Sequence, residues 1–400
     1  MYAYPGPSAC ANHMQRLSRG LIGLRHWPLI VAPQGPDGAS EGADDFGVPF
    51  KAFAMPAKPR FVPYYPHWIG AMRTRMRDTV HRALQQEKYD ALILMGETGW
   101  VFNPVRKLAQ KQGVPVFGYP MEWFAPTFAG LLGFSWFDQW LQRVLTYPKC
   151  DGIIGISRQW ARFAEARHIP TAVVPSFSKY ADDALPDAIS HEPGRFRIAF
   201  VGRWHRRELP PTLFRALDLA IDRGVNLELV VIGSTGKPTF RSQAMEERPS
   251  LRELEKHSRV RERIQFKGFI VGQALIDEMG RADAFVILRD DNLETRSLFP
   301  TRLPEFLSTG RPVIVSDAGD LALYLKDRES ACVIPPGDRP KELADALCFL
   351  ATHPEEARRI GQGGRDALAA HFSQRALARR VTDFVKAHRG NYAARCRHDS

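Results

Sequence analysis

The sequence is poor in cysteine and has no motif that would pair its thiols. Only five of its 400 residues are cysteine, and no two are spaced as Cys-x-x-Cys. They are Cys10, Cys150, Cys332, Cys348 and Cys396. We therefore expect neither a disulfide framework nor a cysteine-based zinc site. The default compartment for such a chain is the cytosol.

Long apolar runs and several catalytic signatures are also absent. The longest uncharged apolar stretch, around Phe128 to Phe137, is about half of what a membrane span needs. No basic or apolar leader pattern follows Met1, so we expect no secretory signal and a cytoplasmic protein. The sequence contains no H-E-x-x-H and no G-x-S-x-G, which argues against a zinc peptidase and a serine-hydrolase elbow.

Acidic residues are outnumbered by basic ones, and the formal net charge is +11. Such a balance attracts nucleic acid, anionic lipid headgroups or phosphorylated substrates, although a solvated basic surface explains it equally well. The basic residues are spread along the chain, and no nucleic-acid-binding motif is present. We therefore expect phosphorylated ligands or an anionic membrane surface as partners, and no nucleic acid.

Short apolar runs alternate with helical patterns along the chain. This alternation predicts an α/β protein with parallel sheets covered by helices on both faces. The predicted strands are 28–33, 91–95, 114–119, 152–156 and 171–175, then 197–202, 227–233, 264–269, 284–288, 312–316 and 331–334. Helices are predicted between most of them, for example 72–86, 158–168, 211–223, 251–260 and 340–352.

A polar, proline-containing stretch interrupts the alternation once and reads as a linker. We expect an N-terminal doubly wound domain over 1–178, the linker over 179–194 and a C-terminal domain over 195–372. A final helix over 373–388 is expected to return to the first domain. Residues 389–400 are expected to form a frayed tail.

The N-terminal domain has no clear opening strand. Such domains usually begin with a buried strand, but here the Pro/Gly segment Tyr4 to Ser8 leads directly into a helical pattern over 9–24. A missing central strand would leave buried backbone groups unpaired. We expect the first strand to be short or missing, and one hypothesis is a mis-assigned start codon. In-frame codons for an apolar run upstream would support that hypothesis, and a stop codon directly upstream would contradict it.

The stretch 298–316 predicts a loop, a short helix, a glycine stop and a buried strand. Pro300 is expected to begin the helix, which places Thr301 and Arg302 near its exposed N–H groups. A helix N-terminus with a nearby cation favours phosphate, and Glu305 can accept hydrogen bonds from sugar hydroxyls. A mid-helix glutamate alone is more often solvent-facing. Together these residues predict a site for a ligand with both a diphosphate and a sugar.

A second candidate is the basic loop after the strand at 197–202. Gly202 allows close approach of a ligand, and Arg203 can bridge phosphate oxygens as a fork. Arg206 and Arg207 add positive charge. The loop follows the carboxyl end of a parallel strand, which is a usual ligand position. The alternative is an exposed basic loop.

His13 and Glu122 are the catalytic candidates on the acceptor side. Glu122 follows a predicted strand and should reach a cleft, whereas a histidine on a helix is more often a core or surface residue. A nearby apolar set at helical spacing predicts core packing, with docking to a membrane interface as the alternative. That set is Trp136, Phe137, Trp140, Leu141 and Val144.

The second half of the chain resembles a known family. From Arg197 to about His388 it is similar to the C-terminal domain of the group 1, family-4-type retaining GT-B glycosyltransferases. The similarity is carried by Ser-Thr-Gly-Arg-Pro-Val-Ile-Val-Ser-Asp at 308–317 and Val-Ile-Pro-Pro-Gly-Asp at 333–338. The run Phe-Pro-Thr-Arg-Leu-Pro-Glu at 299–305 resembles a variant found in members that assemble surface polysaccharides. The first half matches in outline only.

The resemblance implies a GT-B fold, in which two Rossmann-like domains face a cleft. The N-terminal domain would be on the acceptor side, and the C-terminal domain would bind the nucleotide-sugar donor. Glu305 would hold the ribose hydroxyls, and Arg203 with Arg206 or Arg207 would hold the diphosphate. Ser297 stands where the family often has a first glutamate, which touches the donor sugar. The full implied donor-binding set is Gly202, Arg203, Arg206, Arg207, Gly268, Phe269, Ile270, Ser297, Thr301, Arg302 and Glu305.

The implied activity is hexosyl transfer with retention, from a nucleotide-sugar donor to a glycan or lipid-linked acceptor. No cofactor and no metal are expected, and the pathway would be surface polysaccharide or glycoconjugate synthesis. The protein would be cytoplasmic, with peripheral binding at the inner membrane face. Two alternatives stay open: an epimerase-type enzyme on the same fold, and a non-catalytic nucleotide-sugar-binding relative. Ser297 and the shortened start motivate the second.

Overall fold

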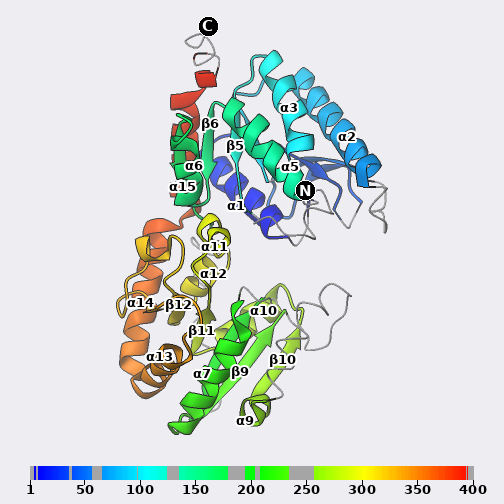
Figure 1. Ribbon diagram of the computed structural model, residues 1–400. Helices are drawn as coiled ribbons and strands as arrows, with labels where there is room; N and C mark the ends of the chain where they lie inside the picture. Colours follow the sequence, from blue (N-terminus) through cyan, green and yellow to red (C-terminus); the bar gives the residue numbers. More distant parts are fainter. Residues whose placement is uncertain are drawn as a thin grey trace. The chain divides into compact units, whose positions relative to one another are not determined.

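A computed structural model of the chain shows two compact α/β units (Figure 1). It describes residues 4–5, 8–35, 38–55, 65–96, 98–123, 135–178, 194–202, 208–233, 256–392 and 394. Unit 1 comprises Met1–Phe177, Arg296–Phe299 and Gln374–Ser400, and unit 2 comprises Ser178–Thr295 and Pro300–Ser373. The predicted linker at 179–194 lies outside the described residues except for Gly194.

Unit 2 is built on one six-stranded sheet in the order β10-β9-β8-β11-β12-β13, and every neighbouring pair is parallel. The strands are β8 (Phe196–Val201), β9 (Leu227–Ile232), β10 (Ile264–Gly268), β11 (Ala284–Ile287), β12 (Val313–Ser316) and β13 (Cys332–Ile334). β9, β11 and β12 are buried along their whole length, because helices cover a parallel sheet on both faces. The order reverses between β8 and β11, and ligands of doubly wound sheets bind beside such a switch point.

The helices of unit 2 connect these strands. They are α7 (Pro210–Asp222), α9 (Ser258–Arg261), α10 (Gln273–Gly280), α11 (Leu293–Ser297), α12 (Leu303–Ser308), α13 (Pro340–Thr352) and α14 (Pro354–His371). The last two residues of α11, Arg296 and Ser297, belong to unit 1. Gly361 lets α14 approach the α12–β12 turn closely, because a Cβ at this position would lie 2.0 Å from the carbonyl oxygen of Gly310. The first half of the helix predicted over 251–260 lies outside the described residues, and α9 begins later than expected.

Unit 1 contains two separate sheets among its described residues. One has the order β1-β3-β2 and the other has the order β4-β5-β6-β7. The strands are β1 (Ile30–Pro33), β2 (Glu41–Ala43), β3 (Pro49–Phe53), β4 (Leu92–Met95), β5 (Val116–Tyr119), β6 (Gly152–Gly155) and β7 (Thr171–Val173). All described pairs are parallel except β2 with β3. The short β2 and β3 are not predicted from the sequence.

Two helix pairs flank these sheets. α1 (Ala9–Gly23) packs with α15 (Gln374–His388), and α2 (Tyr65–Gln86) packs with α3 (Gly99–Lys111) (Figure 1). The contact between α1 and α15 is close, because a Cβ on Gly20 would come within 2.7 Å of the Ala378 Cβ. α5 (Ser135–Leu141), a π-helical segment (Gln142–Thr146), a 3₁₀ turn (Tyr147–Lys149) and α6 (Arg158–Glu165) complete the unit.

The predicted fold class, two doubly wound Rossmann-like domains, is confirmed. The eleven predicted strands all appear, with ends shifted by one or two residues. Among the described residues ahead of α1, the pairing is a single parallel bridge between Tyr4 and Gln34, and the short or missing opening strand of unit 1 stays a prediction.

Candidate functional site

In unit 2, glycines gather where three neighbouring parallel strands end. Gly202 follows β8 with φ of +154°, and its N–H donates to the carbonyl of Ile232 at 2.8 Å. Gly233 follows β9, and its N–H donates to the Gly268 carbonyl at 2.7 Å. A Cβ on Gly233 would lie 3.0 Å from the carbonyl oxygen of Gly202. The structure thus brings the predicted Gly202 and Gly268 together through Gly233, which the sequence analysis had not singled out.

Glu305 lies in the first turn of α12, and its side chain is 13% exposed. Arg302 stands just before the helix and forms an ion pair with Glu305, with 3.8 Å between Nη1 and Oε2. The neighbours Leu303, Phe306 and Leu307 are buried, as expected. A largely buried carboxylate beside a guanidinium and a helix N-terminus is suited to accept hydrogen bonds from hydroxyls.

The start of α12 differs from the prediction. Pro300 was expected in the first turn, but the helix begins at Leu303 and the proline in its first turn is Pro304. Both prolines fit the sequence rule for helix starts, so the rule could not choose between them. Thr301 therefore lies in the turn before the helix and is half-buried.

An ion pair that sequence reasoning missed lies at the end of β11. Arg289 Nη2 is 2.7 Å from Glu208 Oε1, and both side chains are largely buried. The Arg289 N–H also donates to the Ser316 hydroxyl at 3.1 Å, next to the end of β12. The pair thus ties the segment that enters α7 to the carboxyl ends of the central strands. The only local signal in the sequence is Arg289, a charged residue two positions after the last residue of the buried strand β11.

Three of the predicted diphosphate ligands, Arg203, Arg206 and Arg207, lie outside the described residues. Of the residues expected near the base, Phe269 is exposed and Ile270 is half-buried, just beyond β10. Their roles stay predictions.

In unit 1, the ring of His13 is buried in the core, with 1% of its surface exposed. Its Nε2 is 2.8 Å from the Tyr119 hydroxyl, and its Nδ1 has no hydrogen-bond partner among the described residues. The rings of Tyr119 and Phe177 pack edge-on against it. Burial, helped by the charge of Arg16, lowers the pKa of His13 to about 3, so the ring is neutral at pH 7.

Glu122 follows β5 and is half-buried. The ring of its neighbour Trp123 packs on Trp160, with ring centroids 4.8 Å apart. The guanidinium of Arg143 lies over the Trp123 ring. The Trp123 N–H donates to the hydroxyl of Ser297 at 3.1 Å, and Ser297 is fully buried. Ser297 therefore fixes the backbone next to Glu122. The smaller side chain at this position has a structural use that the sequence did not reveal.

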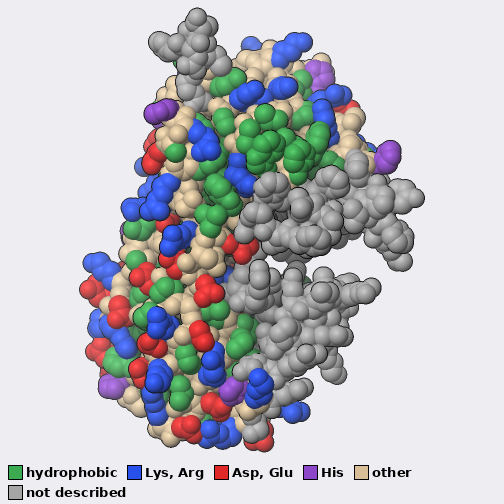
Figure 2. Space-filling model, viewed as in Figure 1, with side chains coloured by type: hydrophobic (Ala, Val, Ile, Leu, Met, Phe, Trp, Pro, Cys, Tyr) green, Lys and Arg blue, Asp and Glu red, His purple; other side chains and the backbone are tan. Residues whose placement is uncertain are grey.

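The expected core packing of the apolar set near α5 is wrong for three of its five members; Leu141 is half-buried, and the side chain of Trp136 lies outside the described part of the chain. Phe137, Trp140 and Val144 are each more than one-third exposed, and Trp100 on α3 joins them. The rings of Phe137 and Trp140 stack at 5.7 Å, and Trp100 lies 6.3 Å from Phe137. Figure 2 shows hydrophobic side chains gathered over α3 and α5. We call Trp100, Phe137, Trp140 and Val144 the aromatic patch.

Within the described part of the chain, no helix is both long enough and apolar enough to cross a bilayer. The same residues contain no group of three or more His, Cys, Asp or Glu side chains placed to hold a metal ion. The expectation of metal-independent chemistry stays a prediction.

Two family models match the sequence and together cover most of it. Residues 195–353 match the model described as "Glycosyl transferases group 1", and residues 8–176 match "Glycosyl transferase 4-like domain". A comparison with curated proteins found no match. The matching family models and the fold define a two-domain glycosyltransferase of the GT-B class. This chain belongs to the group 1 glycosyltransferases.

Solved structures share the fold at low sequence identity. Sucrose-phosphate synthase from Thermosynechococcus elongatus is 16% identical with a TM-score of 0.71, over 94% of this chain and 92% of that one. Anabaena HepE in complex with UDP is 13% identical with a TM-score of 0.67, over 96% and 98%. WaaG, a glycosyltransferase involved in lipopolysaccharide biosynthesis, is 13% identical with a TM-score of 0.65, over 96% and 98%.

Proposed function

We propose that the protein transfers a hexosyl group from a nucleoside-diphosphate sugar to a glycan or lipid-linked acceptor, with retention and without a metal. The observation that carries this proposal is the Glu305 carboxylate, largely buried at the start of α12, in a unit whose parallel strands end in close-packed glycines. Such a carboxylate can accept hydrogen bonds from ribose hydroxyls. The glycines at the strand ends have no side chains, which leaves room for a diphosphate beside the backbone.

We propose that the base of the donor nucleotide is uracil. Support comes from HepE, which was crystallised with UDP and with UDP-glucose and shares the fold over nearly its whole length. The leaving diphosphate gains negative charge as the bond to the anomeric carbon breaks. Arg203 with Arg206 or Arg207 would stabilise this charge, since preorganised donors are each worth about 3 kcal/mol at comparable sites.

In this proposal the acceptor hydroxyl attacks the anomeric carbon on the face from which the diphosphate departs. Its proton passes to the departing phosphate oxygen, and the sugar therefore keeps its configuration. Because the pKa of His13 is lowered to about 3, this residue acts as a neutral hydrogen-bonding group and not as a cation. Glu122 would orient the acceptor hydroxyl.

We place the reaction at the inner face of a membrane, in surface polysaccharide or glycoconjugate synthesis. The aromatic patch supports this, because exposed Trp and Phe side chains favour the membrane interface. Lys and Arg outnumber acidic residues over the whole chain by 55 to 44, which favours anionic lipid.

The experiment that tests the function is a thermal-shift panel of nucleoside diphosphates, followed by a transfer assay with the best ligand's sugar conjugates. A ligand that binds only the native state raises the melting temperature. We expect UDP to give the largest shift, and transfer to release UDP with retained configuration. An isomerised free sugar nucleotide would indicate the epimerase alternative, and no shift with any nucleotide would contradict the proposal.

A further inference from the structure

Unit 1 contains a cavity of about 680 Å³ that takes no part in the proposed transfer. β1 and β4 border it, and α1, α2, α3 and α15 contribute side chains to its wall. All of the residues that line it belong to the described part of the chain. Small-molecule sites in proteins occupy about 300–1,000 Å³, so the cavity is large enough to hold a ligand.

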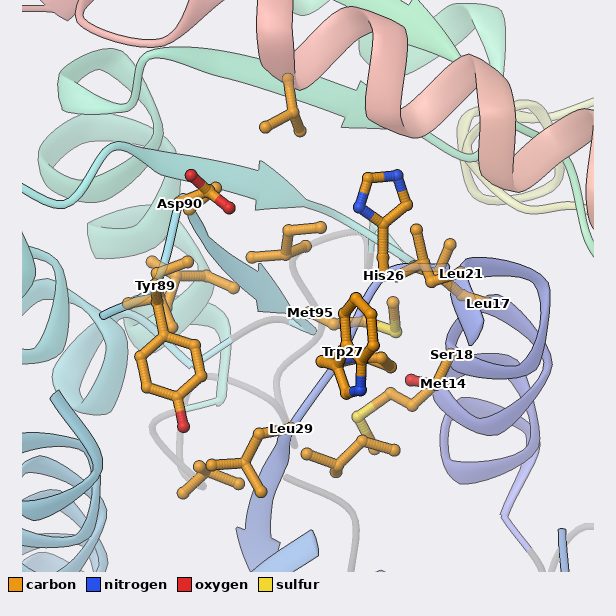
Figure 3. A pocket seen from close by; sticks show the side chains of 18 of the residues that line it. Met14, Leu17, Ser18, Leu21, His26, Trp27, Leu29, Tyr89, Asp90 and Met95 are labelled. Carbon is orange, nitrogen blue, oxygen red and sulfur yellow. The ribbon is translucent and has the colours of Figure 1, made fainter. Parts of the chain in front are cut away.

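The wall of the cavity is mostly apolar. β4 has the sequence Leu-Ile-Leu-Met, and three of its four residues are only half-buried, although a strand of a parallel sheet is usually covered on both faces. These residues line the cavity. Figure 3 shows Met14 and Leu17 of α1 with Met95 of β4 around the open space. Because apolar surface gains most when hydrocarbon covers it, the wall favours an apolar ligand.

Basic side chains line the same cavity without a counter-charge. Arg25 follows α1, and Lys88 precedes β4. Lys386 lies in the last turn of α15, and Arg389 directly follows that helix. All four residues are exposed, and none of their side chains forms an ion pair or a hydrogen bond with another described residue. Lys386 and Arg389 are three residues apart, so their side chains lie on the same face of the chain.

Fewer acidic residues line the cavity than basic ones. They are Glu87 and Asp90. Glu87 accepts a hydrogen bond from the Tyr89 hydroxyl at 3.3 Å, and Figure 3 shows Asp90 and Tyr89 together before β4. The lining therefore carries an excess of positive charge, which attracts a ligand with a negative group.

The cavity opens to solvent beside Trp27. This side chain lines the cavity and is nevertheless 85% exposed. Trp27 lies in the segment that leads into β1, as Lys88 and Tyr89 do for β4, so the opening is near the amino ends of these strands. Ligands of doubly wound sheets bind at the carboxyl ends of the strands. The cavity is therefore separate from the site of the proposed transfer.

We propose that the cavity between β1 and β4 binds one long-chain fatty acid, with its hydrocarbon chain against the apolar wall and its carboxylate beside Lys386 and Arg389. An apolar wall with unpaired cations at its edge matches both parts of such a molecule. The proposal rests on the cavity, its apolar lining and these cations, and it is independent of the proposed function.

The experiment titrates the full chain with parinarate, a fatty acid whose fluorescence increases in apolar surroundings. We expect saturable binding that decanoate displaces. Decanol has the same chain length and no charge, and we expect it to displace parinarate at least tenfold less well. Absence of saturable binding would overturn the proposal, and so would equal displacement by decanoate and decanol.

A charge-reversal pair tests the place of the carboxylate. The double variant Lys386→Glu, Arg389→Glu should weaken parinarate binding by tenfold or more. The matched control is Arg375→Glu, Arg379→Glu, which makes the same change of charge at exposed residues of α15 that do not line the cavity. The control should bind parinarate as the wild type does. Equal weakening in the two double variants would reduce the effect to net charge and would overturn the proposal.

A cavity-filling variant tests the place of the hydrocarbon chain. Ile93→Trp puts a larger side chain on β4 into the cavity and should weaken parinarate binding by tenfold or more, with melting temperature as the check on folding. Unchanged affinity in the folded variant would overturn the proposal. Loss of the signal in Phe137→Ser, Trp140→Ser would place parinarate on the aromatic patch and would also overturn it. If Ile93→Trp does not fold, the charge-reversal pair decides.

Discussion

Phe306 of α12 stacks on Phe285 of β11, with ring centroids 4.3 Å apart and planes 11° from parallel. Both rings are fully buried. This stack anchors the short helix that carries Glu305 to a central strand of the sheet. A helix of six residues cannot hold its own position in water, so tertiary packing must do so.

Truncation of Phe306 should therefore affect both stability and ligand binding. We expect Phe306→Ala to lower the free energy of unfolding by about 3–5 kcal/mol, the usual cost of a buried Phe→Ala change. It should also weaken donor binding, because α12 loses its anchor. The measurement is urea unfolding together with calorimetric titration of the donor nucleotide.

The matched control for this prediction is Phe349→Ala. Phe349 lies on the separate helix α13, and its half-buried ring stacks on His353. It should lower stability and leave the affinity of the folded protein unchanged. Equal affinities for the Phe306 and Phe349 variants would show that the stack does not position Glu305.

The ion pair of Arg289 with Glu208 should act as a positioning device for the basic loop that ends at Glu208. Glu208→Gln keeps the shape but leaves a largely buried guanidinium without its counter-charge, at a cost of about 1–3 kcal/mol. We expect KM for the donor to rise by tenfold or more and kcat to change less. Asp345→Asn, which breaks an exposed ion pair with Arg223 on the same unit, is the control. A kcat loss with unchanged KM would argue against positioning.

His13 should make stability depend on pH. In the unfolded chain the imidazole has a pKa near 6.5, whereas in the folded chain burial lowers it to about 3. Below pH 6.5 the unfolded state binds a proton that the folded state does not, so the free energy of unfolding decreases as the pH is lowered. The loss attributable to His13 is about 2 kcal/mol between pH 7 and 5. Above pH 7 the residue should have no effect.

The comparison that checks this uses His13→Gln, which keeps a group able to bond the Tyr119 hydroxyl. Chemical unfolding of both proteins at pH 7 and pH 5 gives the difference. The wild type should lose more stability than the variant on acidification. Parallel losses in the two proteins would mean that His13 is protonated in the folded state.

The aromatic patch should govern binding to anionic membranes. We expect the double variant Phe137→Ser, Trp140→Ser to reduce cosedimentation with vesicles of phosphatidylglycerol by tenfold or more, since both rings are exposed. Leu323→Ser, an exposed apolar residue of unit 2, is the control and should bind as the wild type does. Unchanged binding of the double variant would show that the aromatic patch does not mediate membrane binding.

Sequence patterns predicted the strands well, because buried parallel strands are continuous apolar runs. Pro340 and Gly202 marked a helix start and a strand end correctly. β2 and β3 were missed, since β2 is exposed and rich in small residues and lacks the apolar pattern. Helical spacing near Trp140 could not distinguish a core face from an exposed one, because both repeat every 3.6 residues.

Some residues of the site were likewise predictable from the sequence and others were not. Glu305 was predictable because a glycine stop and a buried strand follow its helix. Arg289 and Glu208 were not, because their pairing joins segments far apart in the sequence. The use of Ser297 to hold the Trp123 backbone is likewise a tertiary fact that no local pattern records.

The most direct test of the central claim, that Glu305 binds the donor nucleotide, is calorimetric titration of Glu305→Ala with the donor that the wild type uses. Loss of the hydrogen bonds to a charged carboxylate should cost about 1.5–3 kcal/mol, a ten- to hundredfold weaker Kd, and should abolish transfer. Glu355→Ala, on the exposed face of α14, is the control and should bind normally. Wild-type affinity and activity in Glu305→Ala would contradict the account.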